Sequence, residues 1–337
     1  MKIELRQHKT TSRSSEALTH THTKRRFALV GAPFNQMGCV TTCANTAAQL
    51  RESTNSEPGL SEWMAVRNAR WGADIVDAGD VLPSPEVWAL LAQRVDGAPD
   101  ERGLKEQALA RYCADLHAML LMQYRAGRVP LTLGGDHAIA FASVQAALQI
   151  YQQEQGKKVA VVWVDAHADG NHTLDSNLHG KPLAMLMNRY PYHGWSVPVE
   201  RELAVANLFY VGVRDMMPCE YALIRDLGIT CFDMALIEQL GFGEVVRRLC
   251  HELERDYDHV YLSFDYDALD GSLFRACATP NVGGLSARES LHLVHSVASC
   301  AGFIGADFVE YLPERDPDAI SKALMVKLMD AVWGYRI

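Results

Sequence analysis

The sequence predicts a single α/β domain of three layers, in which helices cover both faces of a central, mostly parallel sheet. Short apolar runs rich in β-branched residues alternate along the chain with longer segments of helical periodicity. Several of these runs are apolar throughout, which is typical of strands buried on both faces. Repeated strand–helix alternation builds a parallel sheet covered on both sides. Because we find no internal repeat and no linker rich in Pro, Gly or Ser, the 337 residues are expected to form one domain.

In the first half of the chain the pattern predicts three strands and several helices. The strands are expected at residues 26–31, 73–77 and 129–133. Helices are expected near 42–51, 59–71, 83–99 (together with a variable loop), 104–126 and 138–155. The clearest helix is 104–126, because its apolar residues recur at intervals of three and four.

The second half continues the alternation with five more strands. They are expected at residues 159–164, 208–213, 229–233, 259–265 and 303–309. The intervening helices are expected at 182–189, from after the 208–213 strand to Leu227, at 243–257, at 286–300 and at 317–333. This alternation supports the parallel sheet.

Residues 1–26 differ in composition from the rest. They are rich in Ser, Thr, His, Lys and Arg and lack the apolar core of a secretory signal. We therefore expect a mobile, polar tail at 1–26 and the folded domain at 27–337.

Charge and composition exclude several classes of partner. The chain carries 41 acidic and 32 basic residues, a net charge of −9, and no basic patch of the kind that nucleic-acid binding needs. No apolar stretch reaches the roughly 18–20 residues of a membrane span. The eight cysteines include no Cys-x-x-Cys pair, and in a long chain without a signal peptide they favour reduced thiols and a cytoplasmic location. Cys39 and Cys43 could form a metal or redox pair, although ordinary packing explains them better.

Two predicted strands end in side chains that bind metals. Asp165, His167 and Asp169 follow the strand at 159–164, and Asp265 and Asp267 end the strand at 259–265. Residues i and i+2 of an extended segment point the same way, so each set can share one side. Four crowded carboxylates repel one another unless cations neutralise them. One divalent ion would not need five such ligands, whereas two would.

A third strand end adds a histidine. The strand at 129–133 leads through a glycine turn to His137, so that the set comprises two histidines and four aspartates. Oxygen-rich ligation with one imidazole per metal favours two Mn²⁺ over zinc, with Co²⁺, Ni²⁺ and Fe²⁺ as alternatives. Each aspartate could instead cap the following helix, but three independent strand ends with the same chemistry favour the metal site.

The same residues resemble a known family. The segments Gly-Gly-Asp-His137, Asp165-Ala-His-Ala-Asp-Gly-Asn171 and Ser-Phe-Asp265-Tyr-Asp267 are similar to the three metal-binding motifs of the ureohydrolases, the arginases and agmatinases. The resemblance runs from about Phe27 to the C-terminus and is strongest to arginase. It implies an arginase-like fold in which His137 and Asp169 serve one manganese, His167 and Asp267 serve the other, and Asp165 and Asp265 bridge the two.

The resemblance also suggests residues that contact the substrate. One segment is similar to an arginase segment whose histidine shuttles protons: Ser176-Asn-Leu-His179-Gly-Lys-Pro-Leu-Ala. A histidine suits this role because its charge changes near neutral pH. Phe308-Val-Glu310 is similar to a strand end whose glutamate holds the guanidinium group in a two-oxygen fork. Asn171 and Ser176 are candidates for reading the α-carboxylate.

The chain departs from arginases where the α-amino group is bound. Met217 stands where the family has an aspartate, and a methionine cannot accept a strong hydrogen bond from an ammonium group. Glu220 matches a second family acid and could compensate. The loop between Asn171 and His179 is also shorter than usual.

By resemblance, the chain is a binuclear manganese hydrolase of a guanidino compound. The best match is hydrolysis of L-arginine to L-ornithine and urea, in which a metal-bridging hydroxide attacks the guanidinium carbon. Glu310 would hold the guanidinium, Asp169 would pass the proton to the leaving amine, and His179 would exchange protons with solvent. The family further implies a homo-oligomer, either a trimer or a hexamer.

Three alternatives remain at this stage. The same chemistry could act on agmatine, guanidinobutyrate or formiminoglutamate, which the change at Met217 favours. A non-catalytic family member acting as a binding subunit would not need all six ligands. A deacetylase-like zinc hydrolase of the same general fold would use one zinc and lack the second His–Asp set.

Overall fold

The computed structural model describes residues 25–42, 45–54, 57–94, 100–174, 176–190 and 201–334. The predicted tail lies outside the described residues except for Arg25 and Arg26, and Cys43 lies outside them as well. Arg26 already belongs to the first strand.

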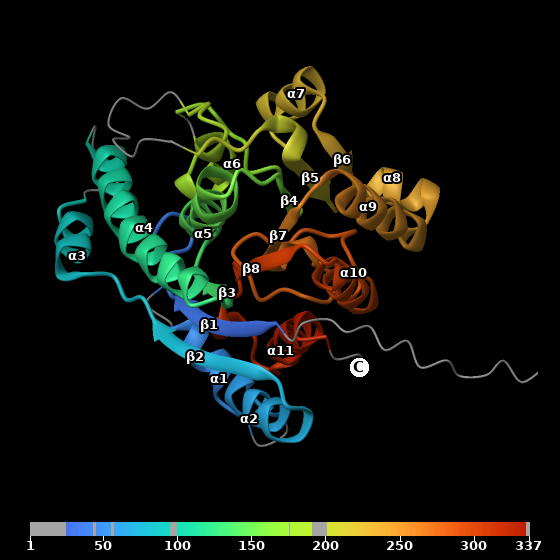
Figure 1. The fold of residues 1–337 in the computed structure, drawn as a ribbon. Coiled ribbons are helices and arrows are strands. Elements are labelled where there is room, and N and C mark those ends of the chain that lie inside the picture. The colour runs from blue at the N-terminus through green and yellow to red at the C-terminus, as the bar shows by residue number, and fades with distance from the viewer. Residues whose placement is uncertain are drawn as a thin grey trace, which may run out of the picture.

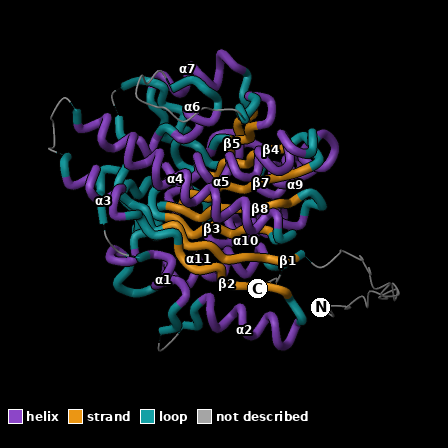
Figure 2. Tube along the Cα trace, turned by 60° about the vertical axis from the view of Figure 1, so that its left-hand side comes forward, coloured by secondary structure: helices purple, strands orange, loops and turns teal. Residues whose placement is uncertain are grey.

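Eight parallel strands form one sheet, which Figure 2 shows as a continuous layer between helices. In spatial order the strands are β2-β1-β3-β8-β7-β4-β5-β6, and every pairing in this sheet is parallel. The strands are β1 (Arg26–Ala32), β2 (Asp74–Asp80), β3 (Val129–Gly134), β4 (Val159–Val164), β5 (Leu208–Val211), β6 (Thr230–Phe232), β7 (His259–Asp265) and β8 (Phe303–Val309). The predicted three-layer α/β class is confirmed.

Helices cover both faces of this sheet (Figure 1). One layer packs on the first hydrophobic core and consists of α1 (Thr46–Arg51), α2 (Leu60–Trp71), α8 (Met234–Leu240), α9 (Phe242–Asp256), α10 (Ala287–Ser299) and α11 (Ile320–Val332). The other layer packs on the second core and consists of α3 (Pro85–Ala92), α4 (Glu101–Arg125), α5 (Ala140–Ala147), α6 (Pro182–Leu186) and α7 (Pro218–Leu227). Strands buried by both layers explain the uninterrupted apolar runs.

The register of the central strands brings their carboxyl ends together. Leu133 of β3 pairs with Phe308 of β8, Asp265 of β7 pairs with Val309, and Val164 of β4 pairs with Phe264. Residues that follow these four strands therefore emerge at one edge of the sheet. In open parallel sheets ligands bind at this edge.

Two segments differ from the sequence-based expectation. The helix predicted at 138–155 consists of a 3₁₀ turn, α5 and a π-helical turn at Leu148–Glu154. The short helix α8 was not predicted. It begins where the Asp233 side chain accepts a 2.7 Å hydrogen bond from Leu236 N, and it ends at Gly241, whose φ of 83° separates it from α9.

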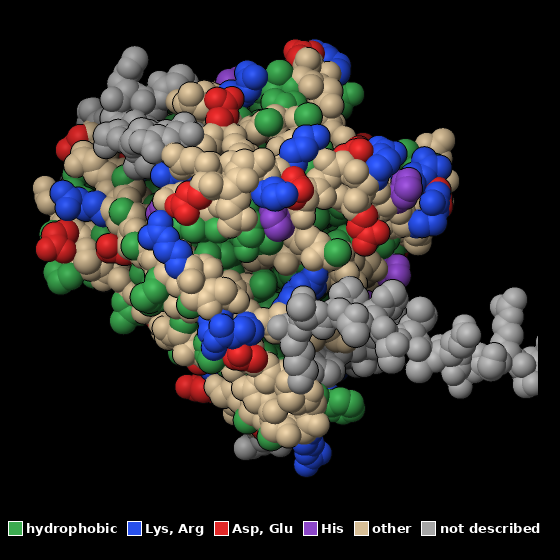
Figure 3. All heavy atoms as spheres, viewed as in Figure 1, with side chains coloured by type: hydrophobic (Ala, Val, Ile, Leu, Met, Phe, Trp, Pro, Cys, Tyr) green, Lys and Arg blue, Asp and Glu red, His purple; other side chains and the backbone are tan. Residues whose placement is uncertain are grey.

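The surface shown in Figure 3 carries Lys and Arg side chains interspersed with Asp and Glu, without a patch of a single sign. Among the helices of the described segments, none combines the length and apolar character needed to cross a bilayer.

A buried ion pair joins α2 to α11. Arg67 donates from Nε to Asp330 Oδ1 (2.8 Å) and from Nη2 to Asp330 Oδ2 (2.5 Å), and both side chains are buried. The Arg67 guanidinium also stacks over Trp63, 4.8 Å from the ring centroid. The pair fastens an early helix to the last one.

Asp330→Ala is expected to lower the free energy of unfolding by about 3–5 kcal/mol, because it leaves the buried guanidinium without its carboxylate partner. Chemical denaturation followed by circular dichroism measures the change. Asp256→Ala is the control, since its pair with Arg255 is exposed and contributes little. A loss for Asp330→Ala no larger than that of the control would refute this role for the pair.

Candidate metal centre

Six side chains predicted as metal ligands converge at the carboxyl ends of β3, β4 and β7. All but His167 are buried, and the side chain of His167 is 28% exposed. They form two overlapping groups that could each hold an ion, and Asp165 belongs to both. The groups are His137, Asp165 and Asp265, and Asp165, His167 and Asp267. Asp169 joins the first group through His137.

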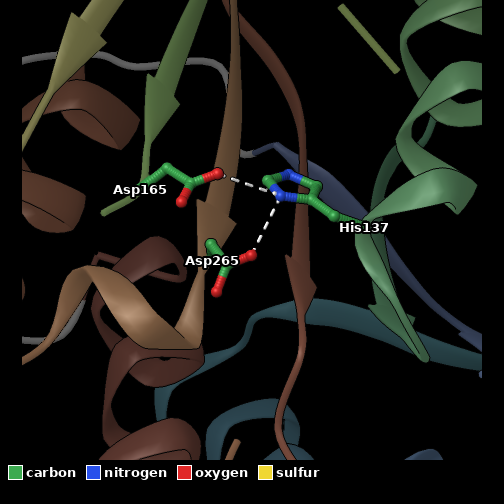
Figure 4. Close-up of side chains that lie close together, drawn as sticks. All are labelled: His137, Asp165 and Asp265. Atoms are coloured by element: carbon green, nitrogen blue, oxygen red, sulfur yellow. Dashed lines mark ion pairs between the residues drawn. The ribbon is translucent and has the colours of Figure 1, made fainter. Parts of the chain in front are cut away.

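In the first group three carboxylates surround one ring nitrogen. His137 Nδ1 lies 2.9 Å from Asp169 Oδ2, 2.9 Å from Asp265 Oδ2 and 3.2 Å from Asp165 Oδ2. Figure 4 shows Asp165 and Asp265 pointing toward the ring of His137. This buried nitrogen makes no hydrogen bond in the structure. A lone nitrogen facing three anionic oxygens is the arrangement that a cation between them would satisfy.

In the second group His167 lies beside the same aspartate. Its Nδ1 is 3.1 Å from Asp267 Oδ2 and 3.5 Å from Asp165 Oδ1. Asp165 thus directs one oxygen to each group, which is the geometry of a bridging carboxylate. Thr279 donates to the Asp267 oxygen that faces His167, at 3.0 Å.

A polar relay behind His137 fixes which of its nitrogens faces the carboxylates. His137 Nε2 lies 2.9 Å from Ser263 Oγ, and Ser263 donates its proton to Asp307. Because Ser263 then accepts at its oxygen, Nε2 carries the hydrogen and Nδ1 keeps a lone pair for a metal. Asp307 also accepts from Ser143 (2.6 Å) and Tyr261 (3.0 Å).

Sequence reasoning did not identify this relay. Ser263 and Asp307 lie inside strands β7 and β8, which are otherwise mostly apolar and are buried except for His259 at the start of β7. The sequence signal for this relay was Asp307, an aspartate in the middle of an apolar strand, because a buried charge needs hydrogen-bonding partners.

The electrostatics of the site fit divalent cations. Burial, reinforced by the nearby Asp165 carboxylate, raises the pKa of Asp169 to about 8. Burial and the carboxylates of Asp267 and Asp165 raise the pKa of Asp265 well above its usual range. Burial alone would lower the pKa of His137, but the carboxylates of Asp165 and Asp169 outweigh it and raise this pKa. The oxygen-rich donor set with two imidazoles suits Mn²⁺ and similar ions.

Two strand-end acids adopt left-handed backbone conformations. Asp169 has φ 47° and Glu310 has φ 63°, values that favour glycine. Such strain persists where surrounding structure imposes it, and it gathers at functional sites. Close packing adds to this constraint at Gly135, where a Cβ would overlap the carbonyl oxygen of Phe34.

A cavity of about 290 Å³ opens above the carboxylates. Its wall contains nine of the eleven residues predicted from the sequence, while His137 and Asp165 lie buried and are not part of the wall. The lining residues are Cys39, His167, Asp169, Asn171, Ser176, Asn177, His179, Gly180, Met217, Glu220, Asp265, Asp267, Thr279 and Glu310. Cys39 is exposed, and Cys43 lies outside the described residues.

Glu310 and His179 occupy different parts of this wall. Glu310 follows β8, is 5% exposed, and accepts a 2.9 Å hydrogen bond from His137 N at Oε1. Burial raises the pKa of Glu310 to about 7. His179 is half-buried, its Nδ1 lies 3.3 Å from the carbonyl oxygen of Met37, and burial lowers its pKa.

Glu220 is already engaged by the backbone. Its Oε1 accepts from Gly170 N (3.1 Å) and its Oε2 accepts from Met217 N (2.9 Å), at the start of α7. The Met217 side chain is 54% exposed at the cavity. To bind the substrate's ammonium group in place of the missing aspartate, as predicted, a Glu220 oxygen must therefore accept a second hydrogen bond.

The chain resembles proteins of known activity along most of its length. Its sequence matches the Arginase family over residues 25–334. An arginase from Coccidioides posadasii is 35% identical over 235 residues, which cover 67% of this chain and 72% of that protein. Human arginase-1 is 29% identical over 313 residues, which cover 89% of each. The solved structure of an arginase from Bacillus caldovelox has a TM-score of 0.78 at 27% identity and covers 93% of this chain and 99% of that one.

The metal-free protein is expected to lose stability as the pH rises from about 4 to about 8. The Asp169 carboxyl has a pKa of about 4 in the unfolded chain and of about 8 in the folded site. At acidic pH it is protonated in both states and folding has no electrostatic cost. As the pH rises, folding must bury a charge or take up a proton, and the stability of the folded state falls. Mn²⁺ needs deprotonated ligands, so its stabilising effect should increase over the same range. Melting temperatures with chelator and with Mn²⁺ measure the difference.

Asp256→Asn, which changes an exposed carboxylate far from the cluster, is the control and should leave this pH course unchanged. A difference between the two melting temperatures that stays constant with pH would contradict the expectation.

Proposed function

This chain belongs to the arginase family, and from that premise we propose that it hydrolyses L-arginine to L-ornithine and urea with two Mn²⁺ per subunit. The resemblance noted in the sequence is thereby confirmed, and the chain is a hydrolase of C–N bonds in amidines. The observation that carries the finer proposal is that four of the six ligand-type side chains line one cavity together with Glu310 and His179, while the other two, His137 and Asp165, lie buried against them.

The proposed ligands divide between the two metals. His137 and Asp169 would hold the first, His167 and Asp267 the second, and Asp165 and Asp265 would bridge them. When bound, the two ions would supply charge neutralisation and a water whose pKa falls toward neutrality. The Ser263–Asp307 relay would keep His137 in the tautomer that binds metal.

Glu310 would hold the guanidinium group. Its Oε1 is held in position by the backbone N–H of His137, so the carboxylate cannot rotate freely. A cationic guanidinium placed against this buried carboxylate favours its ionised form and presents parallel N–H donors to two oxygens. Fixing the planar carbon next to the metal ligands makes the reaction effectively intramolecular.

Asp169 and His179 would move protons. Asp169 would accept the proton released from the attacking water and give it to the leaving amine, since its carboxyl group lies among the proposed ligands, 2.9 Å from His137 Nδ1, and also lines the cavity. His179 lies between the cavity and the carbonyl of Met37, where it can exchange that proton with solvent.

A second candidate keeps the chemistry and changes the substrate. Met217 offers no acceptor to an ammonium group, and both oxygens of Glu220 already accept backbone hydrogen bonds. These contacts favour guanidino compounds without an α-amino group, such as guanidinobutyrate. Agmatine and formiminoglutamate are the further alternatives.

Several expectations stay predictions. They are the identity of the native metal, with Co²⁺, Ni²⁺ or Fe²⁺ in place of Mn²⁺, the trimeric or hexameric homo-oligomer, the cytoplasmic location, and the polar tail at 1–26.

Urea release by the Mn²⁺-loaded protein tests the substrate. L-Arginine, agmatine and guanidinobutyrate are compared side by side, and arginine is expected to give the highest kcat/KM. In Met217→Asp the KM for L-arginine should fall, because an acid then faces the ammonium group. Turnover of guanidinobutyrate alone would replace arginine with the second candidate. No urea from any of the three, with two metals bound, would exclude these guanidino substrates and leave formimino compounds, which release no urea.

Glu310→Gln is expected to lower kcat/KM by about 10- to 150-fold. This range corresponds to the loss of one hydrogen bond to a charged group, which contributes ~1.5–3 kcal/mol. Its Mn²⁺ content after dialysis should equal that of the unmodified protein, since Glu310 is not a proposed ligand. Glu314→Gln, at an exposed acid four residues later, is the matched control. Unchanged turnover, or loss of metal together with activity, would refute the proposed role.

A further inference from the structure

A lysine beside the substrate cavity is completely buried. Lys181 follows His179 and Gly180, precedes α6, and is 0% exposed. It does not line the cavity. Lysine is almost never fully buried unless its ammonium is paired, so the partners of this side chain indicate its role.

The Lys181 ammonium holds the first part of the cavity loop. Its Nζ donates to the carbonyl oxygens of Thr173 (2.6 Å) and Asn171 (3.2 Å) and to Asn171 Oδ1 (3.3 Å). The ring of Tyr190 lies 5.3 Å from Nζ, and Tyr190 donates its hydroxyl to Glu106 Oε1 at 2.7 Å. The cation therefore has an aromatic face and a buried carboxylate close by.

These contacts define the orientation of the Asn171 side chain. Asn171 Oδ1 accepts from Lys181 Nζ, from Thr173 N (2.9 Å) and from Thr173 Oγ1 (2.8 Å). Lysine and a backbone N–H can only donate, so the carboxamide cannot be flipped without placing its N–H₂ against them. Its two N–H donors are then the part of the group left to serve a ligand in the cavity that Asn171 lines.

A second tie to the same network holds the far part of the loop. Arg102 of α4 donates from Nη2 to the carbonyl oxygen of Ser176 (3.0 Å) and from Nη1 to the hydroxyl of Tyr190 (3.0 Å). Glu106 lies one turn further along α4. Helix α4 thus holds the backbone of Ser176 directly, and it is linked to Asn171 through Tyr190 and Lys181.

We propose that Lys181 is a positioning residue for substrate recognition, which holds Asn171 so that its N–H donors face the carboxylate end of the substrate. The inference rests on the proposed function for the identity of that substrate. Lys181 does not touch the reacting atoms, and it acts through Asn171. Its loss therefore affects binding of the non-reacting end, while Glu310, His179 and the metal ligands keep their places.

Lys181→Met tests this role, because methionine fills similar space without a charge or a donor. The KM for L-arginine is expected to rise about tenfold with kcat retained within about twofold. Mn²⁺ content should be unchanged, and backbone amides of residues 171–180 should exchange hydrogen faster. Unchanged KM and exchange, or a loss of kcat together with bound metal, would overturn the proposal.

A second buried lysine provides the control. Lys322 in α11 is 9% exposed, and Lys322→Met should leave KM and loop exchange as they are. If Lys181→Met does not fold, Lys181→Gln decides by the same readouts, since it lacks the charge and the reach to hold both carbonyl oxygens.

Hydrogen exchange and metal content do not depend on turnover. If the unmodified protein releases no urea from arginine, the proposed function fails while these two readouts still test whether Lys181 holds the loop. Faster exchange confined to 171–180 in Lys181→Met would support the positioning role, and exchange like that of the unmodified protein would overturn it.

Discussion

The crowding of anionic side chains at one edge of the sheet is the constraint on which the rest of this structure depends. Four aspartates and Glu310 lie buried at neighbouring strand ends, where burial and neighbouring carboxylates raise the pKa of Asp169, Asp265 and Glu310. Only strong partners can keep such a group together. The two histidines, the backbone N–H groups and the proposed cations are those partners.

Much of the surrounding structure limits the freedom of these acids. The Ser263–Asp307 relay fixes the ring of His137, and the backbone of His137 in turn holds Glu310. Left-handed backbone at Asp169 and Glu310 directs two carboxylates inward at a conformational cost. Outside this centre, Lys181 and Arg102 of α4 hold the loop residues that line the cavity. The acids are therefore held by neighbouring groups such as His137, and these groups are in turn held by residues further from the centre.

The sequence was informative wherever the signal is local. Apolar runs identified the strands, and the acids and histidines after them identified the ligand set, because a strand end and its side chains lie within a few residues. The strand order was not predictable in this way, since the pairing of β8 with β3 joins segments that are far apart in the chain. The partners of Asp307 were missed for the same reason, because Ser143, Tyr261 and Ser263 come from segments far from it in the chain. Those of Lys181 lie within ten residues, but only the folded loop turns their oxygens toward its ammonium group.

The position of β8 has a consequence for biosynthesis. This last strand lies between β3 and β7, so the sheet stays divided into two parts until residues 303–309 have left the ribosome. Until then no strand joins β3, which leads to His137, to β7, which ends at Asp265. Long-range closure of this kind is slow, and the incomplete sheet exposes strand edges that invite aggregation. A nascent chain therefore cannot complete the sheet that carries the centre before β8 has been synthesised.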